Sequence, residues 1–180
     1  FVGSFRLTSE AGIGSGVRVM GDNSLGMGYG TLIKSRGSVS IGNGSRIELG
    51  SQSSTGVGAN TLIGQNAGNS VALGNGANIG NEALNSMALG YNASIGNNST
   101  NSTAIGTNAA ITNNATSAVA LGDNAIVRAN SATALGRLAF ATNENSVALG
   151  YRSTTHYYGN EATREASADA TLSATNKHGL

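Results

Sequence analysis

The residue types that most often carry out chemistry in proteins are sparse in this chain and do not cluster. The 180 residues include two histidines, His156 and His178, and no cysteine. His156 lies beside Tyr157 and Tyr158, and no second candidate ligand follows at a spacing typical of metal sites. We therefore expect His156 to lie at the surface and to bind no metal. Without cysteine, disulfides and thiolate ligands are excluded.

The nine carboxylates and the many serines form no catalytic pattern. Glu161, Glu165 and Asp169 have the spacing of one face of a helix or loop, and no motif supports a glycosidase pair. No serine has a positioned histidine and aspartate, as a nucleophile would require. No glycine-rich turn is followed by Lys-Ser or Lys-Thr, as in a phosphate-binding loop. We therefore expect neither enzymatic activity nor a cofactor.

Charge and hydropathy exclude two further kinds of partner. The net charge is +1, 11% of the residues are charged, and no lysine or arginine lies between Arg46 and Arg128. Nucleic-acid binding needs clustered cations, so no nucleic-acid partner is expected. No apolar run approaches the ~20 residues that cross a bilayer, so we expect no insertion of this chain into a membrane.

The elements that could present a binding surface come from a repeat, small-apolar-small-apolar-Gly. Clear copies are Ser70–Gly74, Ser86–Gly90, Ser102–Gly106 and Ser146–Gly150. Weaker copies end at Gly14, Gly28, Gly42, Gly58, Gly122 and Gly136. Successive glycines of these ten copies are 14 or 16 residues apart. A short fixed period predicts a solenoid, in which each repeat stacks only on its neighbours.

Each repeat contains two short strands joined by a tight turn. Side chains alternate along a strand, so the residues one and three before each Gly share a face, which we assign to the core. On the second strand, the residues three and five after Gly point inward. The expected core includes Val71, Leu73, Ile79, Leu89, Ile95, Ile105, Leu121 and Leu149. The second residue after Gly is Gly or Asn in eight of the ten copies, which predicts the positive φ of a tight turn.

The two extra residues of the longer repeats fall between the second strand and the next copy. They lie in Gly80–Asn85 and Gly96–Asn101, whereas the shorter repeats have only Met20–Asn23 or Thr142–Asn145 there. Loops tolerate insertions, but a one-residue slip in a strand would turn its core face outward. Both repeat lengths are therefore expected to keep the strands in register.

The residue two before each Gly is always Gly, Ser or Ala, and we expect it to point away from the core. This column contains Gly12, Gly26, Ser40, Gly56, Ala72, Ala88, Ala104, Ala120, Ala134 and Ala148. Restriction to the smallest side chains predicts close packing against other copies of the chain around a common axis. The number of copies does not follow from the spacing.

Apolar and aromatic residues at outward positions are the better candidates for binding a partner. Leu62, Ile126 and Phe140 occupy the outward column of the second strand. The residues that follow a motif glycine include Tyr29, Tyr91 and Tyr151. Exposed apolar groups can mark an interaction surface. The alternative for the tyrosines is packing over neighbouring turns or subunit seams.

The run Asn69–Gly74, repeated at Asn85–Gly90, Asn101–Gly106 and Asn145–Gly150, resembles the head repeat of the trimeric autotransporter adhesins, the YadA-like head. The resemblance covers roughly Glu10 to Thr155. It implies a left-handed parallel β-roll, a homotrimer, and display on a Gram-negative outer membrane by an anchor outside this chain. It also implies attachment to extracellular matrix proteins such as collagen, fibronectin or laminin, to cells, or to abiotic surfaces.

The expected organisation is an initial segment over residues 1–10, the head β-roll over 11–155 and a non-repeat segment over 156–180. For residues 156–180, the sequence is compatible with a short helix and with a further strand. Three other functions are also compatible with the sequence. They are a structural or receptor-contacting segment of a trimeric phage or surface fibre, an ice-binding solenoid, and a solenoid hydrolase or lyase. The irregular outward column argues against ice binding.

Overall fold

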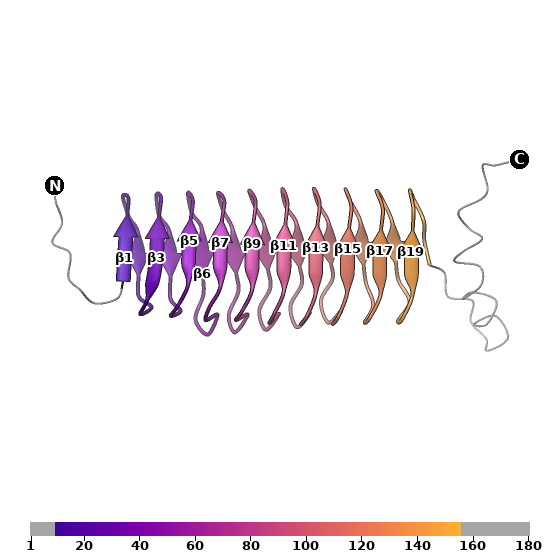
Figure 1. The fold of residues 1–180 in the computed structure, drawn as a ribbon, viewed down its shortest axis with the longest axis horizontal. Helices are drawn as coiled ribbons and strands as arrows, with labels where there is room; N and C mark the ends of the chain where they lie inside the picture. The colour runs from indigo at the N-terminus through magenta and orange to yellow at the C-terminus, as the bar shows by residue number, and fades with distance from the viewer. Residues whose placement is uncertain (1–9, 156–180) are drawn as a thin grey trace, which may run out of the picture.

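The computed structural model describes residues 10–155, which wind into a rod of stacked coils (Figure 1). Each coil contributes one strand to each of two parallel sheets, except that the last described coil adds only an isolated bridge from Thr154 to Phe140 to the second sheet. The ten-stranded sheet contains β1 (Glu10–Ile13), β3 (Ser24–Met27), β5 (Val39–Ile41), β7 (Thr55–Val57), β9 (Val71–Leu73), β11 (Met87–Leu89), β13 (Thr103–Ile105), β15 (Val119–Leu121), β17 (Thr133–Leu135) and β19 (Val147–Leu149). The nine-stranded sheet contains β2 (Arg18–Val19), β4 (Leu32–Ile33), β6 (Arg46–Ile47), β8 (Leu62–Ile63), β10 (Asn78–Ile79), β12 (Ser94–Ile95), β14 (Ala110–Ile111), β16 (Ile126–Val127) and β18 (Phe140–Ala141).

The predicted all-β parallel solenoid is therefore confirmed. Its left-handed winding and the boundaries of the roll stay predictions. His156, His178 and the candidate helix or strand within 156–180 lie outside the described residues.

Every coil pairs in register with the next one, whatever its length. Met87 pairs with Val71 on one side and Thr103 on the other. The extra residues lie in the connection to the next coil, because five residues join β4 to β5 and seven join β6 to β7. The predicted position of the insertion is confirmed.

The motif glycines stack on one another at the turn between the two strands of a coil. Gly90 has a φ of 137°, and a Cβ at this position would lie 2.5 Å from the carbonyl oxygen of Gly106 in the next coil. Two residues later, Asn92 and Asn108 have φ values of 52° and 53°, which confirms the predicted tight turn. Glycine is needed at the first position because both its φ and the neighbouring backbone exclude a side chain.

We expect Gly90→Ala to lower the free energy of unfolding by about 2–3 kcal/mol, since it adds both backbone strain and a clash with the next coil. The control is Gly30→Asn, because Gly30 has a φ of 65° and a Cβ added there would have no other atom within 4 Å. Asparagine tolerates this φ, so the control should change stability little. Urea denaturation of both variants gives the comparison, and equal midpoints would contradict the stacked-glycine explanation.

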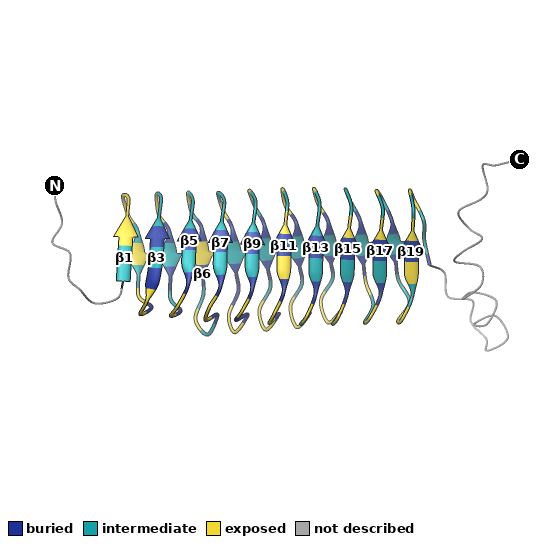
Figure 2. Cartoon of the chain, viewed as in Figure 1, coloured by how far each residue is buried: buried dark blue, intermediate teal, exposed yellow. Residues whose placement is uncertain are grey.

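The core differs from the predicted one on the first strand of each coil. Ile79 and Ile95 of the second strand are buried as expected, with exposed fractions of 0% and 1%. The other predicted core residues are wrong, because they lie on the outer side of the ten-stranded sheet, partly or largely exposed (Figure 2). They are Val71, Leu73, Leu89, Ile105, Leu121 and Leu149.

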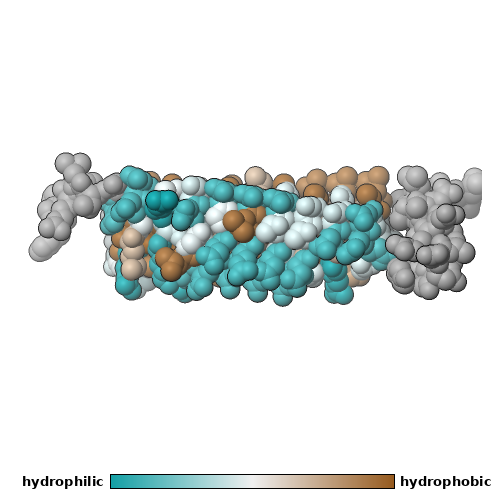
Figure 3. All heavy atoms as spheres, turned by 90° about the horizontal axis from the view of Figure 1, so that it is seen from below, coloured by the Kyte–Doolittle hydropathy of each residue, from teal (hydrophilic) through white to brown (hydrophobic). Residues whose placement is uncertain are grey.

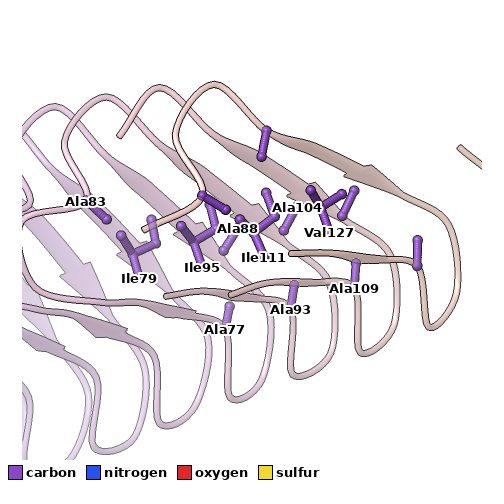
Figure 4. Packing of buried hydrophobic residues seen from close by; sticks show 14 of the residues in the cluster. Ala77, Ile79, Ala83, Ala88, Ala93, Ile95, Ala104, Ala109, Ile111 and Val127 are labelled. Atoms are coloured by element: carbon purple, nitrogen blue, oxygen red, sulfur yellow. The ribbon is translucent and has the colours of Figure 1, made fainter. Parts of the chain in front are cut away.

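The small residues predicted to contact sister copies fill the inside of the coil instead. The buried ones are Gly26, Ser40, Gly56, Ala72, Ala88, Ala104, Ala120, Ala134 and Ala148. Gly12, in the first described coil, is exposed. The sequence correctly predicted that the large and the small residues lie on opposite faces of the first strand. It assigned the two faces the wrong way round, because the small residues point inward. The two sheets lie so close that an isoleucine from one leaves room only for a small residue from the other (Figure 4).

Side-chain volumes within a coil compensate one another. Where the first strand contributes Gly56, the second contributes Thr61, whose Oγ1 would lie 3.1 Å from a Cβ on that glycine. Where the first strand contributes Ala88, the second contributes Ala93, and both are fully buried. The coils that contain β4 to β16 thus reach a filled interior with one large aliphatic side chain, Ile or Val, and several small ones.

Buried serines complete the backbone hydrogen bonding where the chain enters the first strand. Ser86 Oγ accepts a hydrogen bond from the Ser102 amide at 3.2 Å and donates one to the carbonyl oxygen of Ser99 at 3.1 Å. Ser70 Oγ does the same with Ser86 and Ala83. Buried polar groups need such partners, which explains the serine at the start of the repeat.

Candidate functional site

The outer side of the ten-stranded sheet is a continuous apolar face. Two columns of side chains form it, one and three residues before each motif glycine. We call these twenty residues the apolar face. They are Ile13, Met27, Ile41, Val57, Leu73, Leu89, Ile105, Leu121, Leu135 and Leu149, with Ala11, Leu25, Val39, Thr55, Val71, Met87, Thr103, Val119, Thr133 and Val147. Three threonines are the only polar members.

This face is accessible in the single chain. The exposed fractions of Leu121, Leu149 and Val147 are 38%, 49% and 50%. Nine steps of about 4.8 Å between paired strands make the face about 43 Å long. Soluble monomers rarely expose apolar patches larger than a few hundred Å², so a band of this length indicates a surface that another molecule covers.

The outer side of the nine-stranded sheet is different in character. Leu62, Ile126 and Phe140 point outward there and are half-buried, which confirms their predicted orientation. The same column also contains Arg18, Arg46, Asn78, Ser94, Ala110 and Thr154. The Arg128 guanidinium lies 4.8 Å from the centre of the Phe140 ring. This mixture is typical of a surface that faces water.

The turn edge of the rod carries the exposed tyrosines. Tyr91 and Tyr151 have exposed fractions of 55% and 59%. Arg137 and Arg152 lie 5.6 Å and 5.2 Å from the centre of the Tyr151 ring. Such contacts contribute about 0.5–1 kcal/mol at exposed sites. They hold Tyr151 at the surface, where it remains accessible to a partner.

The opposite edge contains the longer connections between coils and is mostly hydrophilic (Figure 3). Its side-chain amides form a ladder from coil to coil. The backbone N–H of Asn81 donates to Asn97 Oδ1, and the backbone N–H of Asn97 donates to Asn113 Oδ1, both at 2.8 Å. Because each Oδ1 is used within the ladder, the side-chain NH₂ groups are left to face solvent.

Residues 10–155 contain no group of three or more His, Cys, Asp or Glu side chains that could hold a metal ion. Over the same stretch, no helix is long and apolar enough to cross a membrane.

The apolar face was not predicted from the sequence, because the repeat pattern placed these residues in the core. A signal for the correct orientation was present in the sequence. The residue two before Gly and the residue three after it vary together, as Gly56 with Thr61 and Ala88 with Ala93. Two positions that share a limited volume must face each other, which places the small column inside.

Comparison with protein families agrees with this architecture. The model of the YadA head domain repeat, which spans two copies, matches residues 95–109, 114–139 and 129–153. These segments cover coils of both lengths. Among curated proteins, none matches the chain.

Proposed function

Because this chain carries YadA head domain repeats, the repeat of trimeric autotransporter adhesin heads, we propose that three copies assemble through the apolar face and attach the cell to extracellular matrix proteins or abiotic surfaces. The repeat belongs to a family of non-enzymatic cell-surface adhesins. Collagen, fibronectin and laminin are the proposed protein partners.

The observation that carries the assembly is the apolar face. Around a three-fold axis, the apolar faces of three chains would contact one another. Side chains such as Leu89 and Leu121 would then be buried away from water. Burial of apolar surface contributes about 25 cal/mol per Å², so a face of this length supplies a large driving force. This arrangement replaces the predicted contact through the small-residue column, which is already filled inside each coil.

The surfaces left outside such a trimer support the adhesive role. Leu62, Ile126 and Phe140 lie on the sheet opposite the apolar face, and Tyr91 and Tyr151 lie on the turn edge. Three copies of each would be presented on one rod. Multivalent contact of this kind raises avidity by about 10²–10⁴-fold without any single tight contact.

Two measurements test the proposal. Light scattering of the full 180-residue chain is expected to give the mass of three chains. Adhesion to surfaces coated with collagen, fibronectin or laminin is then compared between this chain and a variant that lacks residues 75–106. The deletion removes two 16-residue coils, Asn75 to Gly106, and joins equivalent positions, so the fold is kept.

We expect the shortened head to remain trimeric and to adhere more weakly, since it presents fewer contacts. Unchanged adhesion would favour the alternative of a structural fibre segment that sets distance. A mass of one chain would contradict the assembly.

A further inference from the structure

A hollow on the loop edge lies where the coil length changes from 14 to 16 residues. It has a volume of about 240 Å³ and is bordered by connections from three successive coils, through Met20, Asp22, Arg36, Leu49 and Gln52. This volume is below the range of about 300–1,000 Å³ that suits drug-sized ligands, so the hollow accommodates one ring-sized group.

One buried serine fixes the wall of this hollow. Ser35 Oγ donates to the carbonyl oxygen of Glu48 at 2.6 Å and accepts from the Ser51 amide at 2.8 Å. The two residues between them, Leu49 and Gly50, are therefore looped outward past the shorter connection of the preceding coil. The backbone floor of the hollow is thus a consequence of the two-residue insertion, and exposed side chains such as Met20 and Leu49 complete its rim.

The hollow offers one open cation. Lys34 Nζ lies 2.6 Å from Glu48 Oε2, and Arg46 lies 2.7 Å from Oε1 of the same carboxylate. Partial burial raises the pKa of Glu48, but the bonds from Lys34 and Arg46 outweigh it and lower the pKa below its usual value. Glu48 therefore stays ionised and keeps Lys34 in an ion pair, so Lys34 is not free to bind a ligand. Within the described part of the chain, no carboxylate forms an ion pair with Arg36, which is exposed.

The remaining groups match a polar ring with one apolar surface. Met20 and Leu49 are 58% and 65% exposed and stand on either side. The Asp22 carboxylate and the Gln52 amide are partners for hydroxyl or acetamido groups. Asp22 lines the same hollow as Arg36 and brings a negative charge to it, which disfavours a polyanion. A single carboxylate can still bind the guanidinium through two hydrogen bonds.

We propose that this hollow binds one carboxylated sugar unit of a glycan. Arg36 binds its carboxylate, Asp22 and Gln52 bind its hydroxyl or acetamido groups, and Met20 and Leu49 contact its C–H surface. The hollow is complete within one chain. The inference rests on the proposed function only in that an adhesin head displays the site in several copies, which lets a weak single contact hold.

The test is a titration of the full chain with a hexasaccharide of alternating glucuronate and N-acetylglucosamine, followed by NMR or calorimetry. The same hexasaccharide with its carboxylates reduced to alcohols is the ligand control. We expect the first to bind and the second to bind at least 10-fold more weakly. Arg36→Ala should weaken binding of the charged hexasaccharide by at least 10-fold. Arg18→Ala, on the outer side of the nine-stranded sheet, is the matched control, because Arg18 is also exposed, and it should leave the binding unchanged.

Arg36 forms no side-chain hydrogen bond within residues 10–155, so its replacement should preserve the fold, which circular dichroism checks. Equal binding by Arg36→Ala, or equal binding of the reduced hexasaccharide, would overturn the proposal. So would a lack of hexasaccharide binding, or Arg36-dependent binding of an acidic tetrapeptide in its place. In each of these cases a trimeric mass and adhesion to matrix proteins would leave the proposed function standing.

Discussion

Replacement of Ala104 by leucine is expected to lower the free energy of unfolding by about 3 kcal/mol or more and to disrupt the coils on both sides. Ala104 is fully buried in the single chain, between Ala88 and Ala120 of the adjacent coils. Overpacking a filled interior usually costs about 1–3 kcal/mol, and here the neighbouring rungs leave little freedom to shift. Urea denaturation followed by circular dichroism measures the loss.

The matched control is Thr103→Leu, one residue earlier. Thr103 is half-buried on the apolar face, so leucine there adds apolar surface outside the coil and should leave the stability of the coil nearly unchanged. This pair of variants decides which side of the strand is the core. If Ala104→Leu were tolerated and Thr103→Leu were destructive, the assignment of faces would be wrong.

Leu121→Glu is expected to separate the assembled chains. Leu121 belongs to the apolar face and is 38% exposed in the single chain. In a three-fold assembly the substitution would bring three carboxylates near the axis without water, and an unpaired buried charge costs several kcal/mol. The association should weaken by at least 100-fold, and light scattering at micromolar concentration should give the mass of one chain.

Ser94→Glu, on the outer side of the opposite sheet, is the control and should leave the mass unchanged. If the separated chain proves unstable, Leu121→Thr offers a milder change, since threonine already occurs on the apolar face of both adjacent strands, at Thr103 and Thr133. That variant should retain its circular dichroism and dissociate at a higher concentration than the parent chain. An unchanged mass for Leu121→Glu would show that another surface holds the assembly.

The repeat and its register could be predicted from the sequence because they depend on local rules. The glycine and asparagine of the turn are dictated by positive φ, and the inserted residues in Gly80–Asn85 must lie in a connection because strands cannot slip. Ile79 and Ile95 could also be predicted as core residues, because the second strand has a large residue on one face and mixed residues on the other.

The orientation of the first strand could not be read from hydrophobicity alone. Its two faces are both free of charge, one with large aliphatic residues such as Leu89 and one with Ala88 and its equivalents. The usual rule places large aliphatic side chains in the core, but the space between two sheets of one narrow coil is too small for them. The larger apolar surface is then left on the outer side of the coil. The hollow near Leu49 also escaped prediction, because it depends on how far a connection projects in space.

The hydrogen bonds between coils all run along the long axis of the rod, as those from Val71 to Ser86 and from Met87 to Ser102 do. Tension applied along that axis therefore acts on the hydrogen bonds between successive coils one after another. The coil at the pulled end separates from its neighbour first. Each coil that peels away releases about 50 Å of extended chain while the next coil stays intact. In the proposed adhesin, the rod would therefore lengthen in a sequence of small extensions under flow, and contact between three chains along the apolar face would raise the force needed for each one.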